Sequence, residues 1–182
     1  MDDGWTIDDV TIRAERPDDR EAIASVVGAA FGSPVEPRLV DDLRASADFV
    51  PEWALVAEVD GSIVGHVMVT FAVLQDGESA RRIANLSPLA VAPERQHRGI
   101  GTALVGAVTG LVDASGEPLV VLEGSPAYYR RLGFEFSVPH GIHINLPDWA
   151  PREAAQMMRF SNYDPKIRGT VVYPPAFTAA EG

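Results

Sequence analysis

A turn near the middle of the chain constrains the fold more than any other feature. The apolar residues 89–91 are followed by a polar stretch that contains two glycines, Gly99 and Gly101. Beyond Gly99, apolar residues recur at helical spacing. These residues are Ile100, Leu104, Val105, Val108, Leu111 and Val112. The pattern predicts a buried strand that leads through a glycine-containing turn into a helix with one apolar face.

Upstream of this turn, the sequence predicts one strand and two helices. Residues 10–14 alternate between apolar and polar side chains, which is typical of a strand. Asp18 is then placed to cap a helix, with Glu21 three residues later. Apolar residues at 39, 40 and 43 indicate a second, shorter helix.

A hairpin and a bulged strand are predicted next. Two runs rich in β-formers, 53–59 and 63–74, flank an Asp-Gly turn at residues 60–61. A third run, 81–91, contains Pro88. Because proline cannot donate a hydrogen bond to a sheet, we expect this strand to be bulged or split at Pro88.

The remaining residues complete the predicted sheet. Residues 119–122 form a short apolar strand, and a brief helix runs from Ser125 to Arg131. Further strand runs lie around 142–146 and 170–173. The order of the elements predicts an α/β (α+β) fold around one sheet.

The chain is expected to contain one folded unit. We expect a flexible N-terminus over residues 1–9 and a single domain over 10–178, with 139–178 as its C-terminal strands and loops. The apolar runs are too short and too interrupted to cross a bilayer as helices, and the acidic N-terminus does not resemble a secretory signal. The sequence therefore predicts no membrane segment and a cytoplasmic location.

Composition excludes several kinds of chemistry. The chain has no cysteine, which rules out disulfides, thiolate metal sites and any mechanism that carries an acyl group on an enzyme thiol. Its formal net charge of -11 disfavours nucleic acid as a partner and weakly favours a cationic substrate. The histidines show no spacing typical of metal ligands, so no metal site is predicted.

The turn at Gly99 and Gly101 is suited to bind a phosphate group. Glycines at the start of a helix let the backbone approach a ligand, and the first-turn N–H groups are unpaired donors at the positive end of the helix dipole. A P-loop would need a Gly-Lys-Ser/Thr sequence, which is absent, and the dinucleotide fingerprint would need a third glycine where Leu104 stands. For a lone glycine pair, a simple strand-to-helix turn would be the alternative.

Two motifs resemble those of a known family. Residues 96–101, Gln-x-x-Gly-x-Gly, resemble the coenzyme A signature of the GNAT N-acetyltransferase superfamily, and residues 129–134, Tyr-x-x-x-Gly-Phe, resemble its late motif. Residues 86–91, 124–129 and 169–177 are similar to a bacterial group of predicted N-acetyltransferases. The resemblance implies the GNAT fold, a mixed central β-sheet with a bulged, splayed strand pair flanked by helices.

The resemblance also implies a cofactor and a reaction. It implies an N-acetyltransferase that uses acetyl-coenzyme A (acetyl-CoA) as co-substrate and moves the acetyl group to a primary amine by direct attack in a ternary complex. Main-chain N–H groups of residues 97–102 would bind the pyrophosphate, with Arg98 nearby. The cofactor-binding residues that it implies are Leu89, Ala90, Val91, Gln96, His97, Arg98, Gly99, Ile100, Gly101, Thr102, Gly124 and Ser125. The family often has an asparagine where Gly124 and Ser125 stand, and this chain lacks it.

Tyr129 is the implied general acid. It matches the family's tyrosine that commonly protonates the departing thiolate, and a phenol stays protonated at neutral pH. Neighbouring residues on a helix point apart, so we expect Tyr129 rather than Tyr128 to face the cleft.

Two further catalytic groups are considered, a main-chain donor for the acetyl oxygen and a general base. A main-chain N–H, of Leu89 or Ala90, would contact the acetyl carbonyl, where negative charge develops. An amine must lose a proton to attack, and either a carboxylate or a chain of waters can accept it. The side chains considered are Glu123, at the end of an apolar strand and preferred as tentative base, and Glu58 and His66.

Two function classes remain open from the sequence. Besides acetyl transfer, the chain could be a non-catalytic module that binds or senses acyl-CoA, with Tyr129 merely structural. The acceptor, a small-molecule or peptide amine, would be set by loops around 31–50, 75–80 and 139–162. Trp53, Trp149, Met157, Met158 and Phe160 could belong to an acceptor pocket or to the core. The resemblance is compatible with a homodimer.

Overall fold

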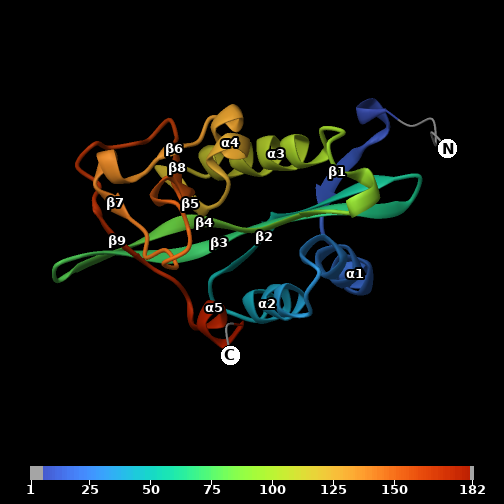
Figure 1. The fold of residues 1–182 in the computed structure, drawn as a ribbon, viewed down its shortest axis with the longest axis horizontal. Helices are drawn as coiled ribbons and strands as arrows, with labels where there is room; N and C mark the ends of the chain where they lie inside the picture. The colour runs from blue at the N-terminus through green and yellow to red at the C-terminus, as the bar shows by residue number, and fades with distance from the viewer. Residues whose placement is uncertain (1–5, 181–182) are drawn as a thin grey trace.

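A computed structural model describes residues 6–180, which fold around one mixed β-sheet (Figure 1). The sheet order is β1-β2-β3-β4-β5-β8-β6, and β9 pairs with both β3 and β7. The β4–β5 and β7–β9 pairs are parallel, and the other pairs are antiparallel. The strands are β1 (Thr11–Ala14), β2 (Phe49–Val59), β3 (Ser62–Asp76), β4 (Ser79–Val91), β5 (Leu119–Glu123), β6 (Glu135–Phe136), β7 (Ile142–His143), β8 (Ala155–Arg159) and β9 (Gly169–Val172).

Helices cover both faces of this sheet. In Figure 1, α3 and α4 lie on one side, and α1, α2 and α5 lie on the other. The helices are α1 (Arg20–Phe31), α2 (Val35–Arg44), α3 (Ile100–Ala114), α4 (Pro126–Tyr129) and α5 (Pro175–Ala180). Within residues 6–180, no helix is both long and apolar enough to cross a membrane.

The expected flexible N-terminus is only partly covered by the structure. Residues 1–5 lie outside the described residues. Ile7–Asp9 form a 3₁₀ turn, after which β1 begins. The side chain of Ile7 lies beside Gly99, because a Cβ built on that glycine would be 3.5 Å from Ile7 Cδ1.

Alternate residues of β4 face opposite sides of the sheet, as strand geometry requires. Leu89 and Val91 pack with the core beneath α3, whereas Ala90 and Ala92 pack with the core formed by α1 and α2. The end of β4 therefore contributes side chains to both faces of the molecule.

The predicted bulge and the implied strand separation are both confirmed. Val67 of β3 pairs with Leu89, but Val69 pairs with Leu86, so β4 has one extra residue at this point, next to Pro88. β4 and β5 pair only at Ala84 and Asn85 of β4. Beyond Asn85 the two strands part, which leaves one edge of β4 without a neighbouring strand among the described residues.

The predicted cap of the first helix is wrong by one residue. A 3₁₀ turn, Pro17–Asp19, precedes α1, so the N-cap position of α1 is Asp19 rather than Asp18, and the Asp19 side chain makes no cap hydrogen bond to α1. Asp19 Oδ2 accepts the main-chain N–H of Arg16 at 2.7 Å and also pairs with the guanidinium of Arg13. The extra turn shifts the start of the helix, and the sequence spacing did not reveal it.

The C-terminal region contains a strand that the sequence did not predict. β8 lies between β5 and β6, and Met157 at its centre is fully buried. Trp53 is also in the core, whereas Trp149 is 85% exposed. Met157 and Trp53 are therefore core residues rather than parts of an acceptor pocket.

Candidate functional site

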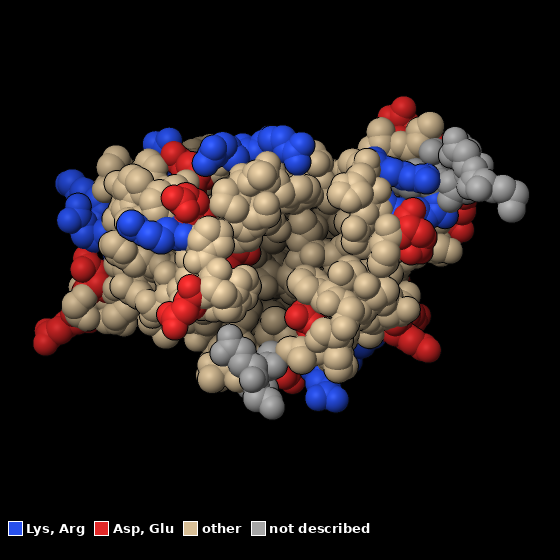
Figure 2. Space-filling view, viewed as in Figure 1, with Lys and Arg blue, Asp and Glu red and all other residues tan. Residues whose placement is uncertain are grey.

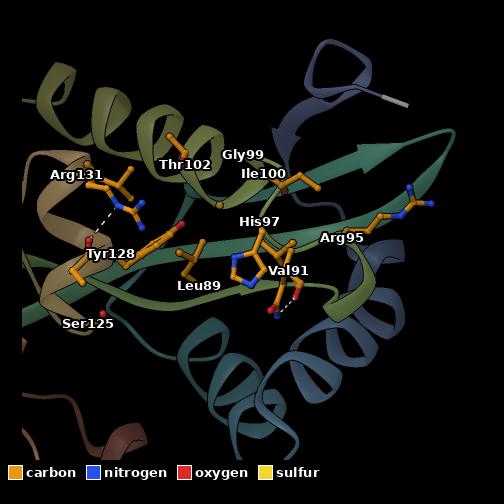
Figure 3. A pocket seen from close by; sticks show the side chains of 14 residues that line it. Leu89, Val91, Arg95, His97, Gly99, Ile100, Thr102, Ser125, Tyr128 and Arg131 are labelled. Atoms are coloured by element: carbon orange, nitrogen blue, oxygen red, sulfur yellow. Dashed lines mark hydrogen bonds between the residues drawn. The ribbon is translucent and has the colours of Figure 1, made fainter. Parts of the chain in front are cut away.

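A cleft of about 780 Å³ opens where the end of β4, the start of α3 and α4 meet (Figure 3). This volume is within the usual range for small-molecule sites, roughly 300 to 1,000 Å³. Its lining residues are Leu89, Val91, Arg95, Gln96, His97, Gly99, Ile100, Gly101, Thr102, Ser125, Ala127, Tyr128, Arg131 and Leu132. Figure 2 shows the same face hollowed at its centre. Nine of the twelve residues expected to bind a cofactor are among those lining residues; Ala90, Arg98 and Gly124 are not.

The glycine turn forms one end of the cleft. Gly99 has a φ of 90°, which requires glycine, and His97 has a φ of 62°, which is uncommon for a residue with a side chain. The first helical hydrogen bond runs from the N–H of Ala103 to the carbonyl of Gly99, at 2.9 Å. The N–H groups of the three preceding residues therefore have no helical acceptor and can bind an anion in the cleft.

Gln96 holds this turn in place. Its side-chain amide donates to the main-chain carbonyl of Val91 at 3.1 Å, which ties the turn to the end of β4. The motif glutamine thus has a structural contact as well as a position in the cleft lining.

The positively charged residues that line the cleft differ from Arg98, the one expected from the sequence. Arg95 and Arg131 line the cleft, whereas Arg98 is exposed and lies outside the lining. Arg131 Nε donates to the carbonyl of Ala127 at 3.2 Å, so its side chain lies along α4. Arg131 follows the late motif's tyrosine by two residues, but the sequence alone did not indicate that it lines the same cleft as the glycine turn.

Tyr128 and Tyr129 occupy different layers of the site. Tyr128 lines the cleft and hydrogen-bonds the side chain of Thr102, and a Cβ on Gly101 would lie 2.4 Å from its hydroxyl oxygen. Tyr129 does not line the cleft; its ring packs against Phe134 with the ring centroids 5.4 Å apart. The lining on this side of the cleft thus includes Tyr128, and the role expected of Tyr129 stays a prediction.

Tyr129 lies instead at the end of β5, where that strand parts from β4. A Cβ on Gly124 would be only 2.3 Å from Tyr129 Cε2, so the absence of a side chain at Gly124 makes room for this ring. Burial raises the pKa of Tyr129, and its hydroxyl therefore stays protonated at neutral pH. Gly124 contributes space for the ring rather than lining for the cleft.

Glu123 lies next to Gly124, but its side chain belongs to the opposite face. Leu119 and Val121, which alternate with it along β5, pack in the core beneath the C-terminal segment rather than beneath α3. Glu123 Oε1 accepts a hydrogen bond from the hydroxyl of Tyr173 at 2.8 Å. The carboxylate and the Tyr129 ring thus flank the end of β5 from opposite sides.

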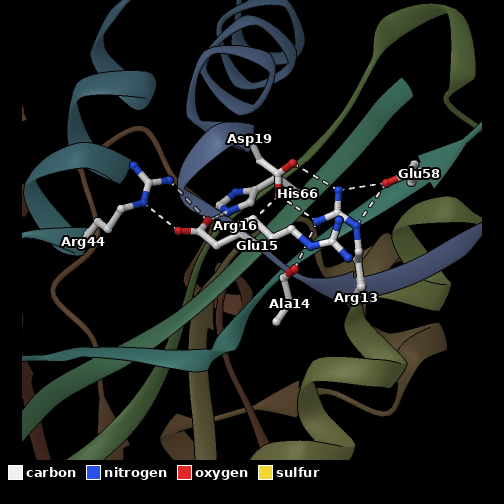
Figure 4. Close-up of polar contacts among 8 residues, drawn as sticks. All are labelled: Arg13, Ala14, Glu15, Arg16, Asp19, Arg44, Glu58 and His66. Atoms are coloured by element: carbon white, nitrogen blue, oxygen red, sulfur yellow. Dashed lines mark hydrogen bonds and ion pairs between the residues drawn. The ribbon is translucent and has the colours of Figure 1, made fainter. Parts of the chain in front are cut away.

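The other two candidate bases lie in structural ion pairs (Figure 4). Glu58 pairs with Arg13 at 2.8 Å. His66 is fully buried and its Nε2 lies 2.9 Å from Glu15 Oε2, which in turn pairs with Arg44. Burial lowers the pKa of His66. None of the three candidate bases lines the cleft, but Glu123 lies at the end of β5, near the point where β4 and β5 part, and its role as base stays a prediction.

Residues 6–180 contain no group of three or more His, Cys, Asp or Glu side chains that could hold a metal ion.

Comparisons with known proteins agree with this geometry. A family model described as an acetyltransferase (GNAT) domain matches residues 11–137. The uncharacterized N-acetyltransferase YhbS of Escherichia coli K12 is 30% identical over 136 residues, which cover 75% of this chain and 80% of YhbS.

Two solved structures are similar over most of the chain. The crystal structure of YhbS from Escherichia coli in complex with CoA has a TM-score of 0.80 and 29% identity, and the match covers 93% of this chain and 92% of that one. A GNAT family acetyltransferase from Brucella melitensis in complex with acetyl-CoA has a TM-score of 0.74 and 31% identity, with 92% and 97% covered.

Proposed function

This chain belongs to the GNAT family of N-acetyltransferases, and on that premise we propose that it moves the acetyl group of acetyl-CoA to a primary amine by direct attack. The observation that carries the proposal is the cleft itself. It has the unpaired N–H groups of a helix start at one end, and at the other it reaches the edge of β4 where β4 and β5 have parted. Such a cleft suits a long cofactor with phosphates at one end and a thioester at the other.

The cofactor's phosphates are proposed to bind at the start of α3. The free N–H groups of the first turn, Ile100, Gly101 and Thr102, would contact the pyrophosphate, with Arg95 and Arg131 as nearby cations. The chain as a whole has a net charge of -11, which would repel phosphates. Two arginines in the cleft lining would offset the negative charge of the bound phosphates.

The pantetheine arm is proposed to run along the free edge of β4. Leu89 and Val91 line the cleft there, and no strand pairs with this edge beyond Asn85 in the described part of the chain. The similar structures were solved with CoA and with acetyl-CoA, which supports the same cofactor here. The main-chain N–H of Leu89 would then contact the acetyl oxygen and stabilise the charge that develops on it.

The transfer is proposed to occur in one complex without a covalent enzyme intermediate. The amine nitrogen forms a bond to the acetyl carbon as the carbon–sulfur bond breaks; Glu123 takes a proton from the amine, and Tyr129 gives its proton to the departing sulfur. The two groups flank the end of β5 from opposite faces, which suits an acceptor that enters opposite the cofactor. The chain has no cysteine that could carry the acetyl group.

Amine-dependent release of thiol tests this function. Purified protein is mixed with acetyl-CoA and a panel of primary amines, and free thiol is followed over time while calorimetry measures acetyl-CoA binding. We expect thiol release well above the rate without amine. Tight acetyl-CoA binding without amine-dependent release would instead support a module that senses acyl-CoA.

The space at Gly124 gives a separate prediction. Gly124→Ala would place a methyl group 2.3 Å from the Tyr129 ring, so the ring must move away from the end of β5. We expect kcat to fall about tenfold while the calorimetric affinity for acetyl-CoA stays within about twofold of wild type, because Gly124 does not line the cleft.

The control for that variant is Gly106→Ala. A Cβ at Gly106, in the middle of α3, meets nothing within 4 Å. Alanine there should leave kcat unchanged and stabilise the helix by roughly 0.5 to 1 kcal/mol. If Gly124→Ala kept wild-type kcat, the placement of the Tyr129 ring against Gly124 would have no role in turnover.

A further inference from the structure

The C-terminal segment brings a pair of aromatic residues together, and one of them, Tyr173, contacts Glu123. Tyr173 follows β9, and Phe177 lies in α5; their ring centroids are 5.0 Å apart, with the ring planes 35° from parallel. The hydroxyl of Tyr173 donates to Glu123 Oε1 at 2.8 Å. Both aromatic residues lie beyond residues 11–137, the part of the chain that matches the family domain.

The fold fixes these aromatic residues on the face opposite α3. β2 pairs with β3 only as far as Thr70, and β9 then takes over the same edge at Val73. After the turn at Pro174, Phe177 packs with the core formed by α1 and α2. Tyr173 and Phe177 therefore lie across the sheet from the glycine turn at which the cofactor is proposed to bind.

The charges at this point favour a cation. Burial and the nearby Glu123 carboxylate raise the pKa of Tyr173, so its hydroxyl stays protonated and donates to that carboxylate. A hydrogen bond to a carboxylate stabilises its charged form. A carboxylate that is hydrogen-bonded to one ring of an aromatic pair is suited to an alkylammonium group, which carries a positive charge on an apolar chain.

The surface also leaves room for such a ligand. Figure 2 shows that the face is hollowed between the layer of α3 and α4 above and that of α2 and α5 below, with Asp or Glu atoms at the wall of the hollow. In this view the lower end of the hollow lies near the C-terminal helix α5.

We propose that Glu123, Tyr173 and Phe177 form the acceptor subsite and select primary alkylamines that carry no carboxylate next to the nitrogen. This inference rests on the acetyl transfer proposed above. The ammonium group contacts the Glu123 carboxylate and the aromatic rings, and its carbon chain packs against Phe177. Glu123, which is exposed, takes one proton from the ammonium group and releases it to water before the nitrogen attacks, and it then takes the second proton as the amide bond forms. Tyr173 acts as a positioning residue that holds Glu123. The Glu123 carboxylate would repel a carboxylate on the α-carbon of an acceptor.

A pair of matched acceptors tests the proposed selectivity. Pentylamine and norleucine have the same carbon chain from the amine outward and differ by a carboxylate at the carbon that bears the nitrogen. At saturating acetyl-CoA, we expect kcat/KM to be at least tenfold higher for pentylamine, and the ratio to shrink in Glu123→Gln. Equal values for the two acceptors in wild type would overturn the inference.

Tyr173→Phe tests the positioning role. The variant keeps the ring and loses only the hydroxyl, so kcat/KM for pentylamine should fall about tenfold, with KM for acetyl-CoA within about twofold of wild type. The acidic limb of the pH–rate profile should move to higher pH, because the carboxylate loses the donor that stabilises its charged form. In the Glu123→Gln background, the same substitution should change kcat/KM less than twofold.

Tyr163→Phe is the matched control, because Tyr163 packs near Arg159, which pairs with Leu119 at the other end of β5 from Glu123. It should leave kcat/KM and the pH profile unchanged. If Tyr173→Phe behaved like this control while wild type acetylated amines, the subsite would be refuted and the transfer activity would stand. If wild type acetylated no amine at all, the proposed function would fail, and the subsite with it. Acetyl-CoA binding by calorimetry shows that each variant is folded.

Discussion

Replacing Tyr129 by phenylalanine is expected to lower kcat by roughly a hundredfold or more, the size typical for losing a general acid. The ring would remain, so its packing against Phe134 and Gly124 should be kept and the fold should not change. Because Tyr129 lies below the cleft lining, the affinity for acetyl-CoA should stay within about twofold of wild type. Steady-state rates and calorimetry on the same preparation measure both quantities.

Tyr128→Phe is the matched comparison. Tyr128 is the neighbouring tyrosine, but it lines the cleft and hydrogen-bonds Thr102 at the start of α3. Its loss should raise KM for acetyl-CoA a few-fold and leave kcat within about threefold of wild type. If Tyr128→Phe instead lost kcat while Tyr129→Phe kept it, the roles of the two tyrosines would be exchanged.

Glu15→Gln is expected to lower the free energy of unfolding by about 3 kcal/mol, since it breaks a buried ion pair and leaves the other charge without its main partner. Glu15 Oε1 lies 2.6 Å from Arg44 Nε, and each of these side chains is only 8% exposed. His66, which is fully buried, contacts the same carboxylate (Figure 4). Urea unfolding at neutral pH measures the difference.

An exposed pair provides the control for this effect. Glu135 pairs with Arg159, and their side chains are 35% and 47% exposed. Glu135→Gln should change the free energy of unfolding by less than about 1 kcal/mol, because solvent screens such pairs. Similar losses in the two variants would show that burial does not decide the contribution of the Glu15 pair.

The buried group also sets a pH dependence of stability. Burial alone would raise the pKa of Glu15, but hydrogen bonds from His66 and Arg44 outweigh it and lower the pKa from 4.5 to about 2. The stabilisation is therefore complete above pH 4.5 and is lost as the pH falls toward about 2. Burial lowers the pKa of His66 below 6.5. As the pH falls, the imidazole is therefore protonated in the unfolded chain before it is protonated in the folded protein, and the free energy of unfolding begins to decrease below pH 6.5.

Urea unfolding at a series of pH values checks the sign. The free energy of unfolding should decrease steadily as the pH falls from neutral, and Glu15→Gln should flatten the part of the curve below pH 4.5. A curve for the wild type that rose on acidification would contradict the contacts assigned to Glu15 and His66.

Local signals in the sequence were enough to predict the elements that build the cleft. Pro88 predicted the bulge in β4, and the spacing of apolar residues after Gly99 predicted α3. These predictions succeeded because proline geometry and helical periodicity act over a few residues. The glycine motif likewise indicated a phosphate site, since both glycines lie at the start of one helix.

Contacts between distant residues were not predictable in the same way. β8 carries no clear strand pattern, because its first three residues are all buried and do not alternate with exposed positions. The partner of Glu123 is Tyr173, which lies 50 residues further along the chain. Arg95 and Arg131 are 36 residues apart in the sequence and line the same cleft only in the folded protein.

The destination of the acetyl group is the most direct test of acetyl transfer. Wild-type protein is incubated with pentylamine and acetyl-CoA that carries carbon-13 in its acetyl group, and the products are separated and identified by mass spectrometry. The label is predicted to appear in N-acetylpentylamine, in an amount equal to the free thiol released. Label found only as free acetate, or retained on coenzyme A although calorimetry shows binding, would contradict acetyl transfer to an amine.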